Sequence, residues 1–285
     1  MTDTHANSTP ESTPVLSKAG AVTSGALTKV PEATALFWLT KIVTTGMGET
    51  TSDWLGSLPV IGVAIGVSVA LAALVTAFVL QFRSDRYRPR IYWSAVVMVS
   101  IFGTVAADVW HAVIGVPYVL SSAGFLVVLL GVLAAWYRSE GTLSIHTINT
   151  RRREKFYWGT VWATFALGTA AGDWTATVLH LGYIDSGLLF AVLIALPALA
   201  HWKLGLNAVV AFWASYIITR PLGASFADWF AVSHAHGGLS FGPGWVSLIG
   251  FVVFAGLLSL ARDNKNPHHA HQLHLQLSGE ESATA

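Results

Sequence analysis

The chain has 285 residues, of which 53% are hydrophobic and only 11% are charged, and its formal net charge is +1. Soluble globular domains carry about 25% charged residues, so this composition excludes an ordinary water-soluble domain and indicates a membrane protein. The lack of cysteine excludes a disulfide framework and a thiolate metal site, so a metal would need oxygen or imidazole ligands.

The chain begins and ends with polar segments. Residues 1–30 are rich in Ser and Thr and lack a hydrophobic segment followed by a small-residue cleavage site, so we expect a disordered tail. Residues 263–285 are expected to form a second polar tail. Between the tails, the apolar stretches long enough to cross the hydrocarbon core are residues 34–56, 60–82, 91–111, 116–137, 156–178, 183–202, 205–229 and 242–262. The sequence therefore predicts an all-α membrane protein with about eight transmembrane helices.

The basic residues between these spans fall in alternate connections. Those after the second and fourth spans are Arg83, Arg86, Arg88, Arg90, Arg138, Arg151, Arg152, Arg153 and Lys155. The connections near residues 57, 114, 181 and 235 contain no Lys or Arg. Because short basic loops stay in the cytoplasm, both termini are predicted to be cytoplasmic.

One sequence pattern occurs four times. An aromatic residue and a Trp are followed by a Gly ten residues after the Trp and an Asp fifteen residues after it. The copies are Phe37-Trp38, Gly48, Asp53; Tyr92-Trp93, Gly103, Asp108; Tyr157-Trp158, Gly168, Asp173; and Phe212-Trp213, Gly223, Asp228. Each copy holds two expected helices, so the four units share one orientation and are predicted to be pseudo-symmetric about the membrane normal. We assign repeat 1 to residues 31–85, repeat 2 to 86–140, repeat 3 with its preceding cytoplasmic loop to 141–202, and repeat 4 to 203–262.

The first repeat resembles a known family. Val30-Pro31-Glu32 through Phe37-Trp38, then Lys41, and the segment from Gly46 to Asp53 are similar to the first repeat of a family of bacterial membrane-anchored proteins with a four-fold tandem two-helix unit of unknown function. The resemblance covers about residues 31–262. It implies a multi-pass protein of the bacterial cytoplasmic membrane and, less directly, a role in metal handling.

Ionisable side chains inside the expected spans are the main functional signal. Each costs at least about 2.5–3.5 kcal/mol on insertion scales, so it normally faces the bundle interior and has a partner. The acids are Asp53, Asp108, Asp173, Asp228 and Glu49, and the bases are Lys41 and Arg220. Because the acids outnumber the bases, the interior is predicted to attract a cation or hold protons, and cation binding would release protons.

The first span has a polar face. Lys41, Thr45, Glu49 and Asp53 recur every four residues and therefore share one side of a helix. Glu49 is an extra acid, because its equivalents in the other repeats are Thr104, Thr169 and Ala224.

In the seventh span, Arg220 and Asp228 follow the same period. Pro221 is predicted to break that helix before the Asp, and a broken helix beside a charge is common in transporters.

Histidines lie close to the expected outer side. Carboxylate and imidazole together suit a transition divalent ion such as manganese, iron or zinc. The candidate ligands are His111, His180, His234 and His236, and the C-terminal tail adds His268, His269, His271 and His274 as a possible loose metal tract. The alternative is that these are solvated loop and tail residues.

Structural interpretations stay open for the other repeated residues. Each Asp could cap a helix end or bond a neighbouring indole, and Lys41 could extend to the lipid headgroups. The four Trp near the cytoplasmic boundary are expected to form an aromatic belt, and the Gly residues to allow close helix packing.

The function predicted from these features is a secondary transporter or channel for a small cation, most of all a divalent metal such as manganese, coupled to protons. The carboxylate cluster would bind the cation, with Lys41 and Arg220 as counter-charges. The alternative is a non-transporting membrane sensor or scaffold with structural Asp residues. We expect no enzyme, no tightly bound cofactor and no nucleic-acid partner, since the chain lacks a P-loop and the HExxH motif and topology explains its basic loops. The expected partners are the lipid bilayer, the cation and protons, and the sequence does not determine the oligomeric state.

Overall fold

The computed structural model describes residues 28–263, so most of the two predicted tails, including the four tail histidines, lies outside the described residues. Within this range the chain is all-helical, without strands, and contains eight helices of 20 or more residues. They are α2 (Ala35–Gly56), α3 (Val60–Arg83), α4 (Pro89–Asp108), α5 (Tyr118–Glu140), α6 (Arg151–Asp173), α7 (Gly182–Leu204), α8 (Ala208–Ala231) and α9 (Pro243–Asp263). These ranges agree closely with the eight predicted apolar stretches.

Residues that favour helix ends stand at several of the helix boundaries. The Thr34 side chain caps α2 by accepting a hydrogen bond from the Phe37 backbone N–H at 3.2 Å. Pro89 occupies the first turn of α4, where its missing N–H costs nothing. Helices α5 and α7 each end before a glycine in the left-handed conformation, Gly141 (φ 69°) and Gly205 (φ 70°). Glycine adopts this conformation easily because it has no Cβ.

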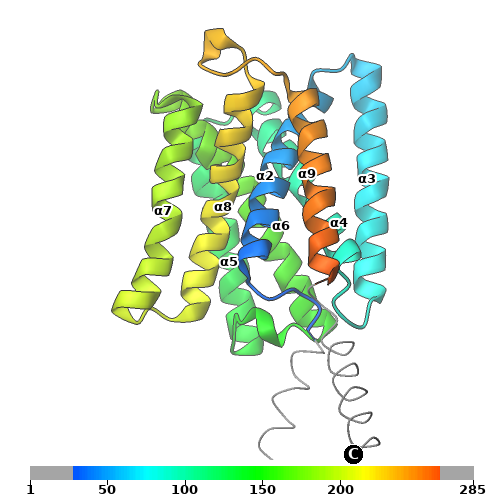
Figure 1. The fold of residues 1–285 in the computed structure, drawn as a ribbon, viewed down its shortest axis with the longest axis vertical. Coiled ribbons are helices and arrows are strands. Elements are labelled where there is room, and N and C mark those ends of the chain that lie inside the picture. Colours follow the sequence, from blue (N-terminus) through cyan, green and yellow to red (C-terminus); the bar gives the residue numbers. More distant parts are fainter. Residues whose placement is uncertain (1–27, 264–285) are drawn as a thin grey trace, which may run out of the picture.

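Four helices form a closed inner ring. Helix α2 packs against α4, α4 against α6, α6 against α8, and α8 returns to α2. The outer helices α3, α5 and α7 each pack on the inner helix of the following repeat, and α9 closes the circle by packing on α2 (Figure 1). The first and last described residues lie at the same end of the bundle (Figure 1). The four inner helices therefore run in one direction around a central axis.

Inner and outer helices differ in polarity. Five helical segments within residues 28–263 are long and apolar enough to cross a membrane: Val60–Arg83, Pro89–His111, Tyr118–Glu140, Gly182–Leu204 and Pro243–Ala261. These include all four outer helices. The inner helices α2, α6 and α8 are less apolar, because polar residues are buried on the sides that face the inside of the ring. The fold is consistent with a membrane protein whose polar interior is surrounded by apolar helices.

The repeated glycines lie where neighbouring inner helices touch. A Cβ added to any of them would approach a side-chain atom of the next inner helix within 2.4 Å, so each position requires glycine's small size. The contacts are Gly48 with Ser100, Gly103 with Phe165, Gly168 with Arg220, and Gly223 with Thr45. The same contact thus recurs at all four interfaces of the ring, which confirms the predicted role of these glycines in close packing.

The predicted break at Pro221 is wrong. Helix α8 continues through Pro221 from Ala208 to Ala231. Gly168 and Gly172 of α6 lie directly against Pro221, with would-be Cβ positions 3.0 and 3.7 Å from its atoms. Close packing against α6 therefore holds the helix together where one backbone hydrogen bond is missing.

The predicted aromatic belt is also wrong for three of the four repeated Trp residues. Trp93, Trp158 and Trp213 are buried, with exposed fractions of 2%, 4% and 4%. Trp158 meets the edge of Phe78 on α3 at a ring-centroid distance of 5.3 Å, and Trp213 Nε1 donates to the Leu143 carbonyl at 2.9 Å. The outer helices and the connection before α6 cover these rings, so they belong to the core at the end of the bundle where the inner helices begin.

Candidate cation site on the central axis

Residues four apart on the inner helices line the axis in successive layers. Since the repeats are in register, each layer takes one equivalent residue from α2, α4, α6 and α8. We call the layer of Asp53, Asp108, Asp173 and Asp228 the acid layer. One turn deeper lies the threonine layer, formed by Glu49, Thr104, Thr169 and Ala224. The end of the bundle with the acid layer is the acid end, and the opposite end, where the inner helices begin, is the aromatic end.

The four acids of the acid layer differ in burial. Asp53 is exposed, Asp108 and Asp173 are half-buried, and Asp228 is only 6% exposed. Carboxylate oxygens of Asp53, Asp228 and Glu49 lie within 4.8 Å of one another. Repeats 1 and 4 therefore bring three acids into one small volume that is open to solvent at Asp53.

The other two acids of this layer do not belong to this group. Asp108 Oδ2 accepts a hydrogen bond from Ser52 Oγ at 3.2 Å, and Asp173 holds the equivalent position on α6. Among the described residues, Asp228 Oδ1 has no hydrogen-bond partner. The structure therefore brings together three of the five predicted acids, Glu49, Asp53 and Asp228, at the junction of α2 and α8, and the convergence of all the carboxylates stays a prediction.

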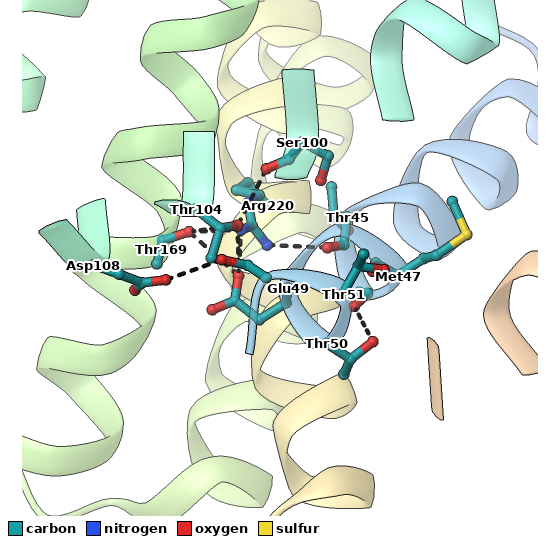
Figure 2. Close-up of polar contacts among 12 residues, drawn as sticks. Thr45, Met47, Glu49, Thr50, Thr51, Ser100, Thr104, Asp108, Thr169 and Arg220 are labelled. Carbon is teal, nitrogen blue, oxygen red and sulfur yellow. Dashed lines mark hydrogen bonds and ion pairs between the residues drawn. The ribbon is translucent and has the colours of Figure 1, made fainter. Parts of the chain in front are cut away.

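Arg220 reaches from α8 into the threonine layer (Figure 2). Its Nη2 donates to Glu49 Oε2, to Thr104 Oγ1, and to Thr169 Oγ1 at 2.6 Å. The two hydroxyls also donate to Glu49 Oε2, at 3.1 and 3.3 Å. Because Arg220 and Glu49 are almost fully buried, this ion pair is shielded from solvent and its loss would leave a charge without a partner.

Lys41 lies one layer beyond Arg220, toward the aromatic end. Its side chain is fully buried, and Nζ lies over the rings of Phe165 at 4.2 Å and Tyr216 at 4.4 Å. Within the described part of the chain, Nζ has no hydrogen-bond partner. The alternative in which Lys41 extends to the headgroups is wrong, because aromatic side chains from α6 and α8 enclose its ammonium.

Aromatic side chains close the axis beyond Lys41. Phe37 and Phe212 lie side by side at a centroid distance of 6.2 Å, and the hydroxyls of Tyr92 and Tyr157 are 2.5 Å apart. These four residues come from equivalent positions of the four repeats. The axis is thus acidic at one end and filled with rings at the other.

The predicted histidine ligands do not join the acid cluster. Nδ1 of His111, His234 and His236 lies 2.8–2.9 Å from an oxygen of its own connection, and His111 also stacks on Tyr118. His180 is exposed and has a positive φ of 56°. In residues 28–263, the group of acidic and histidine side chains close enough to share an ion consists of Glu49, Asp53 and Asp228. A metal role for the histidines stays a prediction.

Two features of the structure have little or no signal in the sequence. The backbone widens into a π-helical turn directly after Asp108 and Asp173, at Val109–Val113 and Trp174–Val178. Such turns are frequent at functional sites. The late position of Trp110 after Asp108 marks the first of these turns, but Trp174 follows Asp173 directly, so the sequence gives no sign of the second.

A second buried ion pair lies at the aromatic end. Lys29 Nζ contacts Glu154 Oε2 at 2.8 Å, and Gln81 Nε2 donates to Glu154 Oε1 at 2.9 Å. Lys29 and Glu154 stand among basic residues that topology already explains, so the sequence does not distinguish them. The pair ties the segment before α2 to the start of α6.

The comparisons with known proteins agree with the four-fold architecture. The family DUF347, described as a repeat of unknown function, matches at residues 36–87, 91–142, 156–205 and 211–262. Each match spans nearly all of one inner helix and one outer helix. No curated protein and no solved structure matches the chain. With four matches over most of its length, the chain belongs to the DUF347 repeat family.

Proposed function

We propose that this protein is an eight-helix integral membrane protein of the bacterial cytoplasmic membrane that moves a small cation, as a secondary transporter or channel. Both termini would be cytoplasmic, because the basic connections, including Arg83, Arg138 and Arg151, lie at the aromatic end. The apolar outer helices support membrane insertion, since they surround the polar faces of the inner ring.

The observation that carries this proposal is the convergence of carboxylates at the acid end. Glu49, Asp53 and Asp228 come from two different repeats and have oxygens within 4.8 Å of one another. Like charges at such distances repel strongly in a medium of low dielectric constant, so the cluster favours a bound cation or protons. Asp53 would admit the ion, because it is exposed, and Asp228 would bind it deeper.

The chemistry of the donors favours a hard divalent cation such as manganese. Within the described residues, the cluster and its neighbours offer only carboxylate and hydroxyl oxygens, and the chain contains no cysteine. Oxygen ligands suit magnesium, calcium and manganese better than copper or zinc. A divalent ion entering this cluster would displace protons from the acids, so uptake of the ion at the acid end is coupled to proton release.

Two basic residues on the axis act as counter-charges in this proposal. Arg220 neutralises Glu49 below the acid layer, and Lys41 adds a second positive charge among the rings. A cation at the acid end therefore meets two positive charges in series before the aromatic end. Passage along the axis requires these side chains to move, which favours alternating access over an open pore.

The second candidate is a non-transporting sensor or scaffold. It is favoured by the internal satisfaction of Glu49, whose carboxylate bonds Arg220, Thr104 and Thr169 as a structural network would. In that case, replacing the acids would change stability but not metal sensitivity.

The test compares an axial acid with a peripheral one. Asp228→Asn removes the buried member of the cluster, whereas Asp185→Asn changes an exposed aspartate in the first turn of α7. We expect Asp228→Asn to abolish manganese flux into proteoliposomes and the change in cellular manganese content that the wild-type protein causes. Asp185→Asn should behave as wild type. Equal flux and equal cellular manganese content for both variants and wild type, at equal membrane abundance, would contradict transport and favour the scaffold.

A further inference from the structure

The Arg220 guanidinium occupies a position shaped like a cation-binding site. Nη2 is surrounded by three oxygens, Glu49 Oε2, Thr104 Oγ1 and Thr169 Oγ1 (Figure 2). Nη1 donates to a fourth, the Thr45 carbonyl, at 3.1 Å. One carboxylate, two hydroxyls and one carbonyl are the oxygen donors that proteins use for hard cations. The positive charge inside this set comes from the protein itself.

The four repeats have diverged in a complementary way at this level. Three of them place an oxygen in the threonine layer, through Glu49, Thr104 and Thr169. The fourth has Ala224, which offers no side-chain oxygen, and supplies the guanidinium of Arg220 from one turn earlier on the same helix. The cationic side chain thus fills the place that the fourth oxygen leaves open.

Glu49 links this set to the acid layer. Its carboxylate bonds Arg220 and also lies within 4.8 Å of the oxygens of Asp53 and Asp228. Asp228 Oδ1 is buried and has no hydrogen-bond partner among residues 28–263, so the cluster contains an acceptor that is available to a cation. An ion held by Asp53 and Asp228 would need only to exchange ligands at Glu49 to move one layer deeper.

We propose that Glu49, Thr104, Thr169 and the Thr45 carbonyl form a second, deeper cation subsite, which Arg220 occupies as a tethered competitor. The subsite takes a hard divalent cation such as Mn²⁺, and it deepens, and so rests on, the proposed cation transport. Arg220 and the ion exclude each other, so the ion advances along the axis only when the guanidinium withdraws. Arg220 Nε is buried without a hydrogen-bond partner in the described chain, so the guanidinium is not fully bonded in this position.

The experiment counts bound Mn²⁺ on the purified full-length protein by electron paramagnetic resonance, in which the signal of free Mn²⁺ disappears on binding. Arg220→Met and Arg220→Gln remove the competing charge, and both should bind one Mn²⁺ ion more per chain than wild type. Adding Glu49→Gln to either variant should abolish the extra ion. Arg138→Met is the matched control, since it removes an exposed arginine at the aromatic end and should leave the number unchanged.

A double variant covers the case in which the neutral variants do not fold. Thr104→Val with Thr169→Val keeps the Arg220–Glu49 ion pair but removes two oxygens from the subsite. We expect Mn²⁺ binding at the acid layer to persist and the rate of flux into proteoliposomes to fall at least tenfold. Unchanged flux in this variant would overturn the proposal.

The outcomes separate the subsite from transport itself. If wild type carries Mn²⁺ but folded Arg220→Met and Arg220→Gln bind no additional ion, the subsite is wrong and the proposed function stands. If wild type carries no Mn²⁺ while both neutral variants bind an extra ion that Glu49→Gln removes, the subsite exists and the transport function is wrong.

Discussion

The two ends of the central axis are built from the same repeated helix face but have opposite chemistry. At the acid end, Asp53, Asp228 and Glu49 gather oxygens around a volume that reaches solvent. At the aromatic end, Tyr92 and Tyr157 meet through their hydroxyls, and the rings of Phe37 and Phe212 lie against each other. Equivalent positions of the four tandem units thus carry acidic side chains at one end of the axis and packed aromatic rings at the other.

The two buried basic residues of the axis, Arg220 and Lys41, have equally different partners. Arg220 has a carboxylate and two hydroxyls as partners, whereas Lys41 lies over the rings of Phe165 and Tyr216. A paired buried charge contributes to stability chiefly because its removal leaves the partner charge uncompensated. A charge held by ring faces leaves no such partner. The comparison predicts that stability depends strongly on the charge of the Arg220–Glu49 pair and weakly on the charge of Lys41.

Breaking the ion pair should have the largest effect. Glu49→Ala leaves the guanidinium of Arg220 buried without a carboxylate and is expected to destabilise the fold by about 3–5 kcal/mol. The measurement is reversible chemical unfolding in detergent. Glu32→Ala, which removes an exposed acid just before α2, is the control and should change stability by less than about 0.5 kcal/mol.

A double-mutant cycle sharpens this prediction. Glu49→Ala with Arg220→Met removes both charges, and much of the lost stability should return, because replacing a whole buried pair by apolar groups is often nearly neutral. If the double variant is as unstable as the sum of the two single variants, the pair is not the interaction that stabilises the acid end.

An intermediate effect is expected from changing the spacing of the inner ring. A Cβ at Gly168 would lie 2.2 Å from Arg220 Cγ and 2.5 Å from its Cβ, so Gly168→Ala forces α6 away from α8. Overpacking of this kind costs about 1–3 kcal/mol. Gly131 on α5 faces open space, and Gly131→Ala should be neutral or stabilising by up to about 1 kcal/mol. Equal unfolding free energies for the two variants would show that the ring does not depend on this close contact.

The sequence predicts the helices and the register of the repeats because both depend on local sequence patterns. Apolar stretches set the helix lengths, and the recurring Trp, Gly and Asp set the register of the repeats, so the predicted ranges match the observed helices closely. The predicted symmetry implies that repeat 4 meets repeat 1, but the packing of α9 on α2 depends on contacts between residues far apart in the chain and does not follow from local patterns.

The sequence also identifies most residues of the site but not their partners. The four-residue period places Lys41 and Glu49 on one helix face, yet it carries no information on how α2 stands against α8. The contact of Arg220 with Glu49, Thr104 and Thr169 therefore appears only in three dimensions. The predictions of a helix break at Pro221 and of an exposed aromatic belt are wrong for the same reason, because the residues that pack against these side chains come largely from other repeats.

The smallest effect is expected at Lys41, which gives the strictest test of the comparison between Lys41 and Arg220. Lys41→Met removes a cation–π contribution of about 0.5–2 kcal/mol but also the cost of burying an ammonium without a hydrogen-bond partner, so the unfolding free energy should change by less than about 1 kcal/mol. Lys203 provides the control, because its ammonium lies 3.9 Å from the Trp202 ring centroid on the exposed surface and Lys203→Met should have almost no effect. A loss of more than about 3 kcal/mol in Lys41→Met would mean that Lys41 is held as firmly as Arg220. The contrast between the two buried cations of the axis would then fail.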